Sequence, residues 1–399
     1  MEKRALSIVI ISHAGIRQIN RGVYRELNKE CSVRLIIPAI IDFGSGKTLA
    51  YEPAAEGDPD LYPLPLKGRN PRTYYYEGLT TLLESIAPNV VLLENDPVSR
   101  LGFMLSRWAG RRKGRRLFCQ SYENIRRDIL GTLKAQGWKA VPRNLIMHIF
   151  YRYMSGKIDG VLVVNKESEK IFGKYQYQRV IHIPLGYDPN VFFPDQTLRE
   201  CYRAKLKISA DTILVAYFGR LVPQKGVHLL LEALAKIKSL NWMLLLDHDF
   251  DSLNEYAQSI QLRIKQVGLQ QRVLRFEADH FEIANYMRAA DVMVAPSLTT
   301  PEFKEQYGRA VQEAMACGCT VLVADSGHLP DLVANPMLVF EENNVPHLQE
   351  KLTELILQVN LRNAYSVNLY KRAETQLTIQ VQARELLRLL WANKIELTC

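Results

Sequence analysis

The sequence predicts an α/β protein with two domains, on the basis of three observations. The chain has 399 residues, which is long for one hydrophobic core and fits two domains of about 200 residues. Hydrophobic residues make up 47% and charged residues 23%, as in ordinary folded proteins. Short apolar runs alternate with longer amphipathic stretches, which is typical of parallel strands joined by helices.

The apolar runs give the expected strands in chain order. The first could be mistaken for the apolar part of a signal peptide, but no small-residue cleavage site follows it. Two Rossmann-like sheets, one in each half, follow from this order. The expected strands are Leu6–Ser12, Val33–Pro38, Val90–Glu94, Arg116–Cys119, Gly160–Val164 and Val180–Ile183, then Ile213–Gly219, Trp242–Leu246, Val273–Glu277, Val292–Ala295, Thr320–Ala324 and Met337–Phe340.

A segment rich in proline and turn-forming residues separates the two halves. It runs from Ile183 to Pro194 and leaves little room for a helix. Near the end of the chain, Ala373–Trp391 predicts one long amphipathic helix. The expected boundaries are 1–185 for an N-terminal domain, 186–375 for a C-terminal domain and 376–399 for a C-terminal helix.

Basic residues concentrate in the first half. Residues 100–157 hold 14 Lys and Arg against only Glu123 and Asp128. Such a cluster attracts anionic lipid headgroups, polyphosphates or nucleic acid, and it also fits a plain solvated surface. The six cysteines lack paired spacing, which favours a reducing compartment over a disulfide framework. We expect a cytoplasmic protein that contacts the inner membrane face through 100–157 and has no nucleic-acid partner.

Several familiar motifs are incomplete in this chain. Gly44-Ser-Gly-Lys-Thr48 resembles the end of a phosphate-binding loop, but the glycine required five residues before Gly46 is Ile41. No Gly-x-Gly-x-x-Gly opens either half, so no dinucleotide cofactor is predicted. The nucleophile sequence Gly-x-Ser-x-Gly is also missing.

An acidic turn follows one expected strand of the second half. Asp247, Asp249 and Asp251 come directly after Trp242–Leu246, where carboxylates could hold Mg²⁺ or Mn²⁺ on a diphosphate. The turn equally suits a solvated cap of the next helix. We predict no metal site, and a metal-dependent enzyme using these residues is kept as an alternative.

Two segments of the second half carry residues suited to a phosphorylated ligand. Arg220 and Lys225 flank a strand-to-helix turn, the place where open parallel sheets bind ligands, and they would bring two cations to a diphosphate. Further on, Glu305 and Glu313 surround an expected helix start near Gly308, whose free N–H groups suit phosphate. Taken singly, each of these residues also fits an ordinary surface or cap position.

These segments together resemble the retaining glycosyltransferases of family 4, which have the GT-B fold of two facing Rossmann-like domains. The family's Gly-Arg-x(4)-Lys-Gly turn is matched by Gly219–Gly226, and its paired-glutamate motif by Glu305–Gly318. The resemblance is strong from about residue 160 to residue 335 and weak before that. It extends to Val163–Ser168, Ile183–Asp188, Phe192 and Ala290–Ser297.

The resemblance implies roles for individual residues. Arg220 and Lys225 would hold the donor diphosphate, Glu305 the transferred sugar and Glu313 the ribose. The stretch Phe276–His280 would contact the nucleobase, and Gly15 would belong to the glycine loop of the N-terminal domain. The C-terminal helix would cross back to that domain. The expected catalytic residues are Glu305, Arg220 and Lys225, and the expected donor-binding residues are Gly15, Gly219, Arg220, Lys225, Glu305, Tyr307, Gly308, Arg309 and Glu313.

The chain departs from the family pattern at three places. Only Gly15 stands where two glycines are common, and Gln120 takes the place of a histidine near the reacting carbon, on the sugar or acceptor side. The acidic turn 247–251 replaces usual glycines. These departures leave the positioning of the sugar open.

The expected activity is a retaining transfer of sugar from a nucleotide-sugar donor to a polysaccharide, a lipid-linked acceptor or another hydroxyl. No cofactor is expected besides the donor, for which a UDP-sugar is the base-rate choice. Three alternatives remain: a metal-dependent transferase using Asp247 and Asp249, a nucleotide-sugar 2-epimerase that needs no acceptor, and a non-catalytic protein that binds nucleic acid or lipid.

Overall fold

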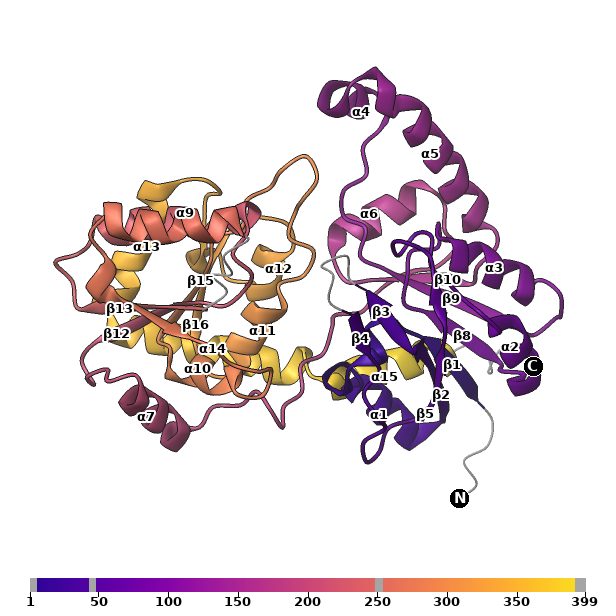
Figure 1. Cartoon of the computed structure of the whole chain (residues 1–399), viewed down its shortest axis with the longest axis horizontal. Helices are drawn as coiled ribbons and strands as arrows, with labels where there is room; N and C mark the ends of the chain where they lie inside the picture. Colours follow the sequence, from indigo (N-terminus) through magenta and orange to yellow (C-terminus); the bar gives the residue numbers. More distant parts are fainter. Residues whose placement is uncertain (1–5, 43–47, 248–253, 392–399) are drawn as a thin grey trace. The chain divides into compact units, whose positions relative to one another are not determined.

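The computed structural model describes residues 6–42, 48–247 and 254–391, and the chain divides into two compact units. Unit 1 comprises Met1–Gly186 with Ile379–Cys399, and unit 2 comprises Tyr187–Thr378. Each unit contains one large parallel sheet with helices packed on it (Figure 1). Two sequence features lie largely outside the described residues. They are the Gly44–Thr48 segment, of which only Thr48 is described, and the acidic turn, of which only Asp247 is described.

The sheet of unit 1 has seven strands in the order β11-β10-β9-β8-β1-β2-β5, all parallel. Six of them confirm the strands expected in the first half. The seventh, β5, was missed because Pro63 interrupts its pattern, and proline is tolerated on an edge strand. The strands are β1 (Ser7–Ile11), β2 (Ser32–Pro38), β5 (Asp60–Leu64), β8 (Val90–Leu93), β9 (Arg116–Ser121), β10 (Gly160–Val163) and β11 (Val180–His182), with small antiparallel pairs β3 (Ile40–Asp42) with β4 (Thr48–Ala50) and β6 (Leu66–Lys67) with β7 (Tyr75–Tyr76).

Helices cover both faces of this sheet because its strands are apolar on both sides. Side chains of β1 alternate between two cores, with Ile8 and Ile10 in one and Val9 and Ile11 in the other. The first core is covered by α1 (Gly22–Glu30) and α15 (Ile379–Trp391), and the second by α2 (Leu79–Ile86), α3 (Arg100–Ala109), α5 (Val141–Ser155) and α6 (Lys166–Lys174); α4 (Ile129–Gln136) precedes α5.

The sheet of unit 2 has six parallel strands in the order β14-β13-β12-β15-β16-β17. They confirm the six strands expected in the second half. The strands are β12 (Ile213–Tyr217), β13 (Trp242–Asp247), β14 (Val273–Phe276), β15 (Val292–Ala295), β16 (Thr320–Ala324) and β17 (Val339–Phe340). The helices are α7 (Gln196–Lys205), α8 (Val227–Ala235), α9 (Glu255–Gln266), α10 (Ile283–Ala289), α11 (Arg309–Ala316), α12 (Leu329–Val333), α13 (Val345–Leu357) and α14 (Val359–Gln376).

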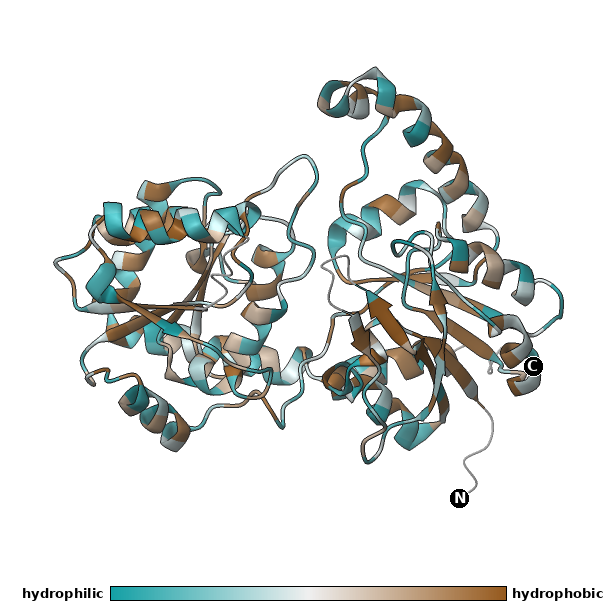
Figure 2. Cartoon of the chain, viewed as in Figure 1, coloured by the Kyte–Doolittle hydropathy of each residue, from teal (hydrophilic) through white to brown (hydrophobic). Residues whose placement is uncertain are grey.

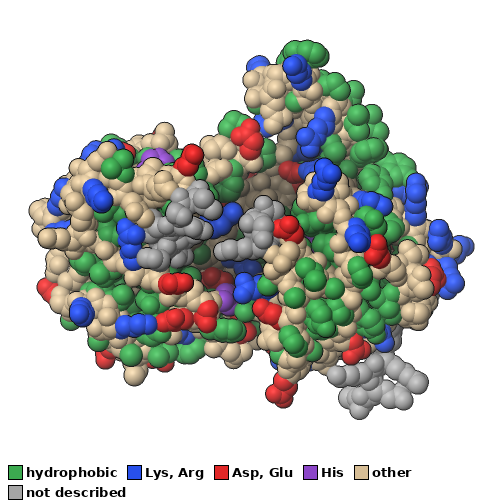
Figure 3. All heavy atoms as spheres, in the orientation of Figure 1, with side chains coloured by type: hydrophobic (Ala, Val, Ile, Leu, Met, Phe, Trp, Pro, Cys, Tyr) green, Lys and Arg blue, Asp and Glu red, His purple; other side chains and the backbone are tan. Residues whose placement is uncertain are grey.

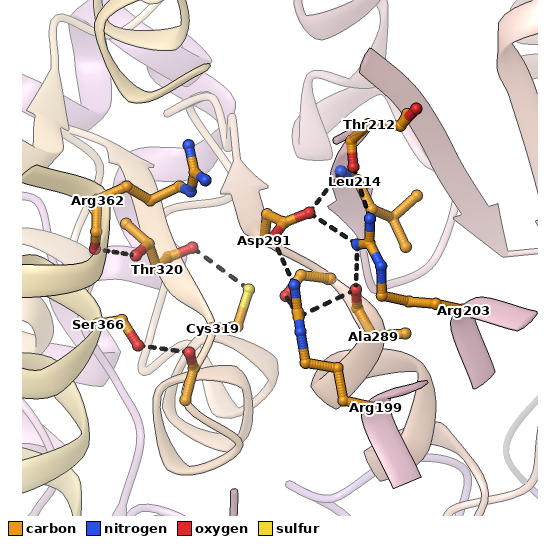
Figure 4. A network of polar contacts seen from close by, with 12 residues as sticks. Arg199, Arg203, Thr212, Leu214, Ala289, Asp291, Cys319, Thr320, Arg362 and Ser366 are labelled. Atoms are coloured by element: carbon orange, nitrogen blue, oxygen red, sulfur yellow. Dashed lines mark hydrogen bonds and ion pairs between the residues drawn. The ribbon is translucent and has the colours of Figure 1, made fainter. Parts of the chain in front are cut away.

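A largely buried ion-pair network fixes α7 against this sheet (Figure 4). The carboxylate of Asp291, which directly precedes β15, lies 2.6 Å from Arg199 and 2.9 Å from Arg203. The same carboxylate accepts a hydrogen bond from the backbone N–H of Leu214, in β12, at 2.8 Å. Three charged groups are therefore mutually satisfied, which burial requires.

The long helix expected over Ala373–Trp391 is wrong, because the chain breaks between α14 and α15. At the break, the carbonyl of Leu377 accepts hydrogen bonds from Tyr187 N at 2.9 Å and from Gln312 Nε2 at 2.8 Å. Those partners replace the helical bonds that a continuous helix would make. After the break, α15 packs in unit 1 through Ala383, Leu386, Leu389 and Leu390, so the C-terminal helix does return to the N-terminal unit.

Candidate functional site

The first two predicted site residues that the structure joins are Lys225 and Glu305. Lys225 ends a 3₁₀ turn after β12, and Glu305 lies in the segment between β15 and α11. The Lys225 Nζ is 2.5 Å from Glu305 Oε2, and Ser297 Oγ donates to the same oxygen at 2.8 Å. The two charged side chains are 22% and 11% exposed, so their pairing takes place largely out of water.

Two glycines make this approach possible. Gly226 has φ of 65°, and a Cβ there would lie 1.9 Å from the Pro296 carbonyl oxygen. Gly327 has φ of 59°, and a Cβ there would lie 2.0 Å from the carbonyl oxygen of Glu305. At either position, a residue with a side chain would adopt a disfavoured backbone conformation. Its Cβ would also collide with the carbonyl oxygen of the neighbouring segment. The backbone therefore holds the lysine and the glutamate together.

The segment after Glu305 leads into α11. Gly308 caps the helix with φ of 95°, and a Cβ there would lie 2.6 Å from the Leu329 side chain. Tyr307 is buried and stacks on His328, with ring centroids 5.2 Å apart. Arg309 is the first helical residue and is exposed. The start of this helix carries the partial positive charge of the helix dipole, which suits an anion.

Glu313 lies in the second turn of α11 and is 9% exposed. Burial raises its pKa to about 7, and the Arg309 guanidinium 3.9 Å away partly opposes the shift. A buried carboxyl whose pKa is this high can change protonation near neutral pH. Such groups are frequent at functional sites.

The remaining predicted residues of unit 2 have contacts with partners other than Lys225 and Glu305. Arg220 follows Gly219 and has an exposed side chain, while its carbonyl accepts a hydrogen bond from Tyr217 Oη at 2.8 Å. In the stretch expected to meet a nucleobase, Phe276 is buried against Phe218, and His280 contacts the ring of Phe192. Among the predicted site residues of unit 2, the structure therefore shows two charged pairs: Lys225 with Glu305, and Arg309 with Glu313.

The two predicted residues of unit 1 are both buried near strand ends. Gly15 follows β1, and its N–H donates to Ser12 Oγ at 3.0 Å. Its closest side-chain neighbours would meet a Cβ at 3.1 and 3.2 Å, which leaves little room for a larger residue. Gln120 is 4% exposed in β9 and donates to Tyr122 Oη at 2.9 Å.

Sequence reasoning missed two titratable residues beside Gly15 and Gln120. His13 follows β1, bonds to Tyr76 Oη through Nδ1 at 2.8 Å, and has its pKa lowered to about 4 by burial. Glu94 follows β8, and desolvation raises its pKa despite hydrogen bonds from Ser12 and Tyr24. Both are polar residues within two positions of the end of a parallel strand, and this placement is the sequence signal that indicates them. The sequence predicts Glu94 as the last residue of a strand, whereas β8 ends at Leu93.

The described ranges, which omit most of the acidic turn, contain no group of three or more His, Cys, Asp or Glu able to hold a metal. Within the same ranges, no helix has the length and apolar character needed to cross a membrane.

The fold is that of the GT-B glycosyltransferases, and residues 199–372 match the family described as glycosyl transferases group 1. Among solved structures, a sucrose-phosphate synthase of Thermosynechococcus elongatus is similar with a TM-score of 0.69 and 18% identity, covering 98% of this chain and 100% of that one. HepE of Anabaena, in complex with UDP and glucose, is similar with a TM-score of 0.71 and 17% identity over 97% and 100%.

One curated relative is a D-inositol 3-phosphate glycosyltransferase of Mycolicibacterium smegmatis. It is 31% identical over 181 residues, which are 44% of this chain and 39% of the relative. The chain thus spans about two fifths of the length of that relative.

Proposed function

We propose that this protein is a retaining glycosyltransferase of family 4 type that takes a sugar from a nucleotide-sugar donor held mainly by unit 2. The contact between Lys225 and Glu305 is the observation that carries the proposal. It places a cation and a hydrogen-bond acceptor at the C-terminal ends of parallel strands, where such sheets bind ligands.

The two residues suit opposite parts of an activated sugar. Lys225 supplies positive charge to a diphosphate, together with the exposed Arg220 and the N-terminus of α11. Glu305 accepts hydrogen bonds from sugar hydroxyls and, without donor, neutralises Lys225. The ion pair therefore holds the lysine side chain in place before the donor arrives.

In the proposed reaction, the bond between the anomeric carbon and the diphosphate oxygen breaks while a bond to the acceptor oxygen forms on the same face. The acceptor proton passes to the departing diphosphate oxygen, so atoms and charge balance. Lys225, Arg220 and the α11 N–H groups stabilise the charge that develops on the diphosphate. Preorganised donors of this kind contribute about 3 kcal/mol each.

The choice of donor follows the same chemistry. Glu313, buried on α11, is placed in this proposal against the ribose hydroxyls. A UDP-sugar is the first donor to test, since the structurally similar HepE is described in complexes with UDP and with UDP-glucose. We propose a hydroxyl of a polysaccharide or of a lipid-linked glycan as the acceptor, and the cytoplasm as the compartment.

A nucleotide-sugar panel tests the proposal. One donor should raise the melting temperature of the wild-type chain by mass action. Transfer products from that donor should keep the anomeric configuration in proton NMR. Inverted product would contradict retention, and a chain stabilised by no nucleotide sugar would contradict the donor site.

Two further measurements separate the rival activities. Loss of transfer on adding a chelator would favour a metal-dependent enzyme that uses Asp247 and Asp249. Conversion of the donor to its 2-epimer without any acceptor would favour an epimerase. Nucleotide binding without either reaction would favour a non-catalytic protein.

A further inference from the structure

Helix α5 of unit 1 has two apolar sides: one is packed in the core, and the other is largely exposed among the described residues. Tyr151 and Met154 are fully buried in the core that covers the sheet. On the other side, large apolar side chains recur at spacings of one and four residues, which places them in a single stripe. These residues and their exposed fractions are Leu145 46%, Ile146 50%, Ile149 58%, Phe150 39% and Tyr153 52%.

The stripe continues into the preceding helix. In α4, Ile129, Leu130 and Leu133 are 44%, 68% and 45% exposed, and Trp138 in the connection is 72% exposed. Figure 2 shows the hydrophobic colour along α5, and Figure 3 shows hydrophobic side chains with Lys and Arg among them over this part of unit 1. Scattered exposed apolar residues are ordinary, but a contiguous set of this kind marks a binding surface.

The stripe borders a cationic cavity on α3. Phe103 of α3 contacts the rings of Phe150 and Tyr153, with centroids 5.3 and 6.3 Å apart. Phe103 also lines a cavity of about 570 Å³ whose other walls include Arg100, Arg107 and Arg111. Apolar residues and three guanidinium groups are therefore continuous on one surface.

Acidic residues offset only part of this charge, since Glu84, outside the region, pairs with Arg112 at 3.5 Å and with Arg115 at 2.7 Å. Between 100 and 157 the only two are Glu123 and Asp128, against 14 Lys and Arg. Glu123 pairs with Arg72 at 2.9 Å, outside the region, and Asp128 caps α4 by accepting from Gly131 N at 2.6 Å. The surface is thus both apolar and strongly basic.

We propose that this surface, which we call the α3–α5 face (residues 100–111 and 129–153), docks on a bilayer that contains anionic phospholipid. The apolar stripe of α4 and α5 enters the boundary between headgroups and acyl chains, and the arginine cavity receives a lipid phosphate. This combination of an apolar side with flanking cations is how interfacial helices bind anionic membranes without crossing them. Neither part of the docking requires the donor or the transfer reaction.

A membrane contact made by charge alone and one that also inserts apolar side chains should respond differently to salt. This difference allows the proposal to be tested. A purely electrostatic contact is lost when salt screens it. Inserted apolar side chains keep part of the binding at high salt. Trp138, at the exposed end of the stripe, should also report insertion as a blue shift of its fluorescence.

The experiment is co-sedimentation of the full chain with phosphatidylcholine vesicles and with vesicles that also contain phosphatidylglycerol. The wild type should bind the anionic vesicles and retain part of that binding in high salt. Substituting Leu130→Gln, Ile146→Gln and Ile149→Gln together should weaken vesicle binding by about ten-fold or more. Substituting Arg107→Gln and Arg111→Gln should remove most of the preference for anionic vesicles.

The matched control carries Leu262→Gln, Leu357→Gln and Val367→Gln, three similarly exposed apolar residues of unit 2, and should bind like the wild type. Circular dichroism melting checks that each variant folds, and single substitutions replace any combination that does not. Wild-type binding by the Leu130, Ile146 and Ile149 variant would overturn the proposal. So would a wild type that ignores vesicles but forms a dimer abolished by the same substitutions, which would assign the face to a second copy.

Discussion

The carboxylate of Glu313 lies 3.9 Å from the guanidinium of Arg309, yet burial outweighs this attraction and raises the pKa of Glu313 to about 7. Arg309 is half exposed, so water screens its charge, whereas Glu313 is 9% exposed. The folded chain therefore holds a proton on Glu313 over a pH range in which the unfolded chain has released it. Stability must depend on pH through this group.

Replacing Glu313→Gln should remove that dependence. Folding raises the pKa of Glu313 from 4.5 to about 7. The stability that this protonated carboxyl contributes is therefore fully present below the pKa of the unfolded chain, and it is lost as the pH rises through the pKa of the folded chain. Relative to the wild type, the variant should therefore gain about 2 kcal/mol of stability between about pH 5.5 and about pH 8. Urea unfolding at both pH values measures this gain. Glu350→Gln, an exposed position on α13, is the control, and an equal gain there would contradict the assignment.

Lys225→Ala should weaken UDP binding by about ten-fold to 100-fold, because the variant loses the charged hydrogen bond that we propose between Lys225 and the diphosphate. Glu305→Gln should instead keep UDP binding and lose transfer activity, since Glu305 is proposed to contact the sugar. Calorimetry with UDP and a transfer assay separate the two effects. Lys236→Ala, an exposed lysine after α8, should match the wild type. If Lys225→Ala binds UDP normally, the lysine does not hold the diphosphate.

Gly226→Ala should destabilise unit 2 by about 1–3 kcal/mol. Its left-handed conformation disfavours a side chain, and the new Cβ would meet the Pro296 carbonyl oxygen. The resulting shift of the loop should also weaken UDP binding, because Lys225 is the preceding residue. Gly173→Ala in α6 is the matched control, since a Cβ there meets nothing within 4 Å. Chemical denaturation of both variants gives the comparison, and equal effects would contradict the steric argument.

Asp291→Asn should cost about 3 kcal/mol of stability, because Arg199 and Arg203 would lose their common anionic partner. Unlike the Lys225 variant, it should bind UDP normally below its melting temperature, since Asp291 lies at the N-terminal end of β15. Lys225 and Glu305 instead follow the C-terminal ends of the parallel strands β12 and β15. Thermal unfolding and calorimetry test both statements. Glu200→Gln, on the exposed side of α7, should have little effect on stability. A loss of UDP affinity at Asp291→Asn without loss of stability would show that the network acts on the site.

Much of the fold and part of the candidate site were predictable from local sequence. The apolar runs predicted twelve strands of the two large sheets, because strands buried on both faces must be apolar throughout. The edge strand β5 was missed because Pro63 hides its pattern, and the C-terminal helix was predicted as unbroken because its sequence gives no stop signal at Leu377. That break depends on partners from Tyr187 and Gln312, which are far away in the chain.

The same division holds for function. By itself, the sequence determined which residue types stand after which strands, including Lys225, Glu305 and Glu313, because strand order and turn glycines are local properties. Only the tertiary structure decided that Lys225 contacts Glu305, that Glu313 is buried enough to titrate near neutral pH, and that the described residues leave one side of α5 largely exposed. Contact and burial depend on packing between segments that are distant in the chain, and the sequence of one segment does not determine that packing.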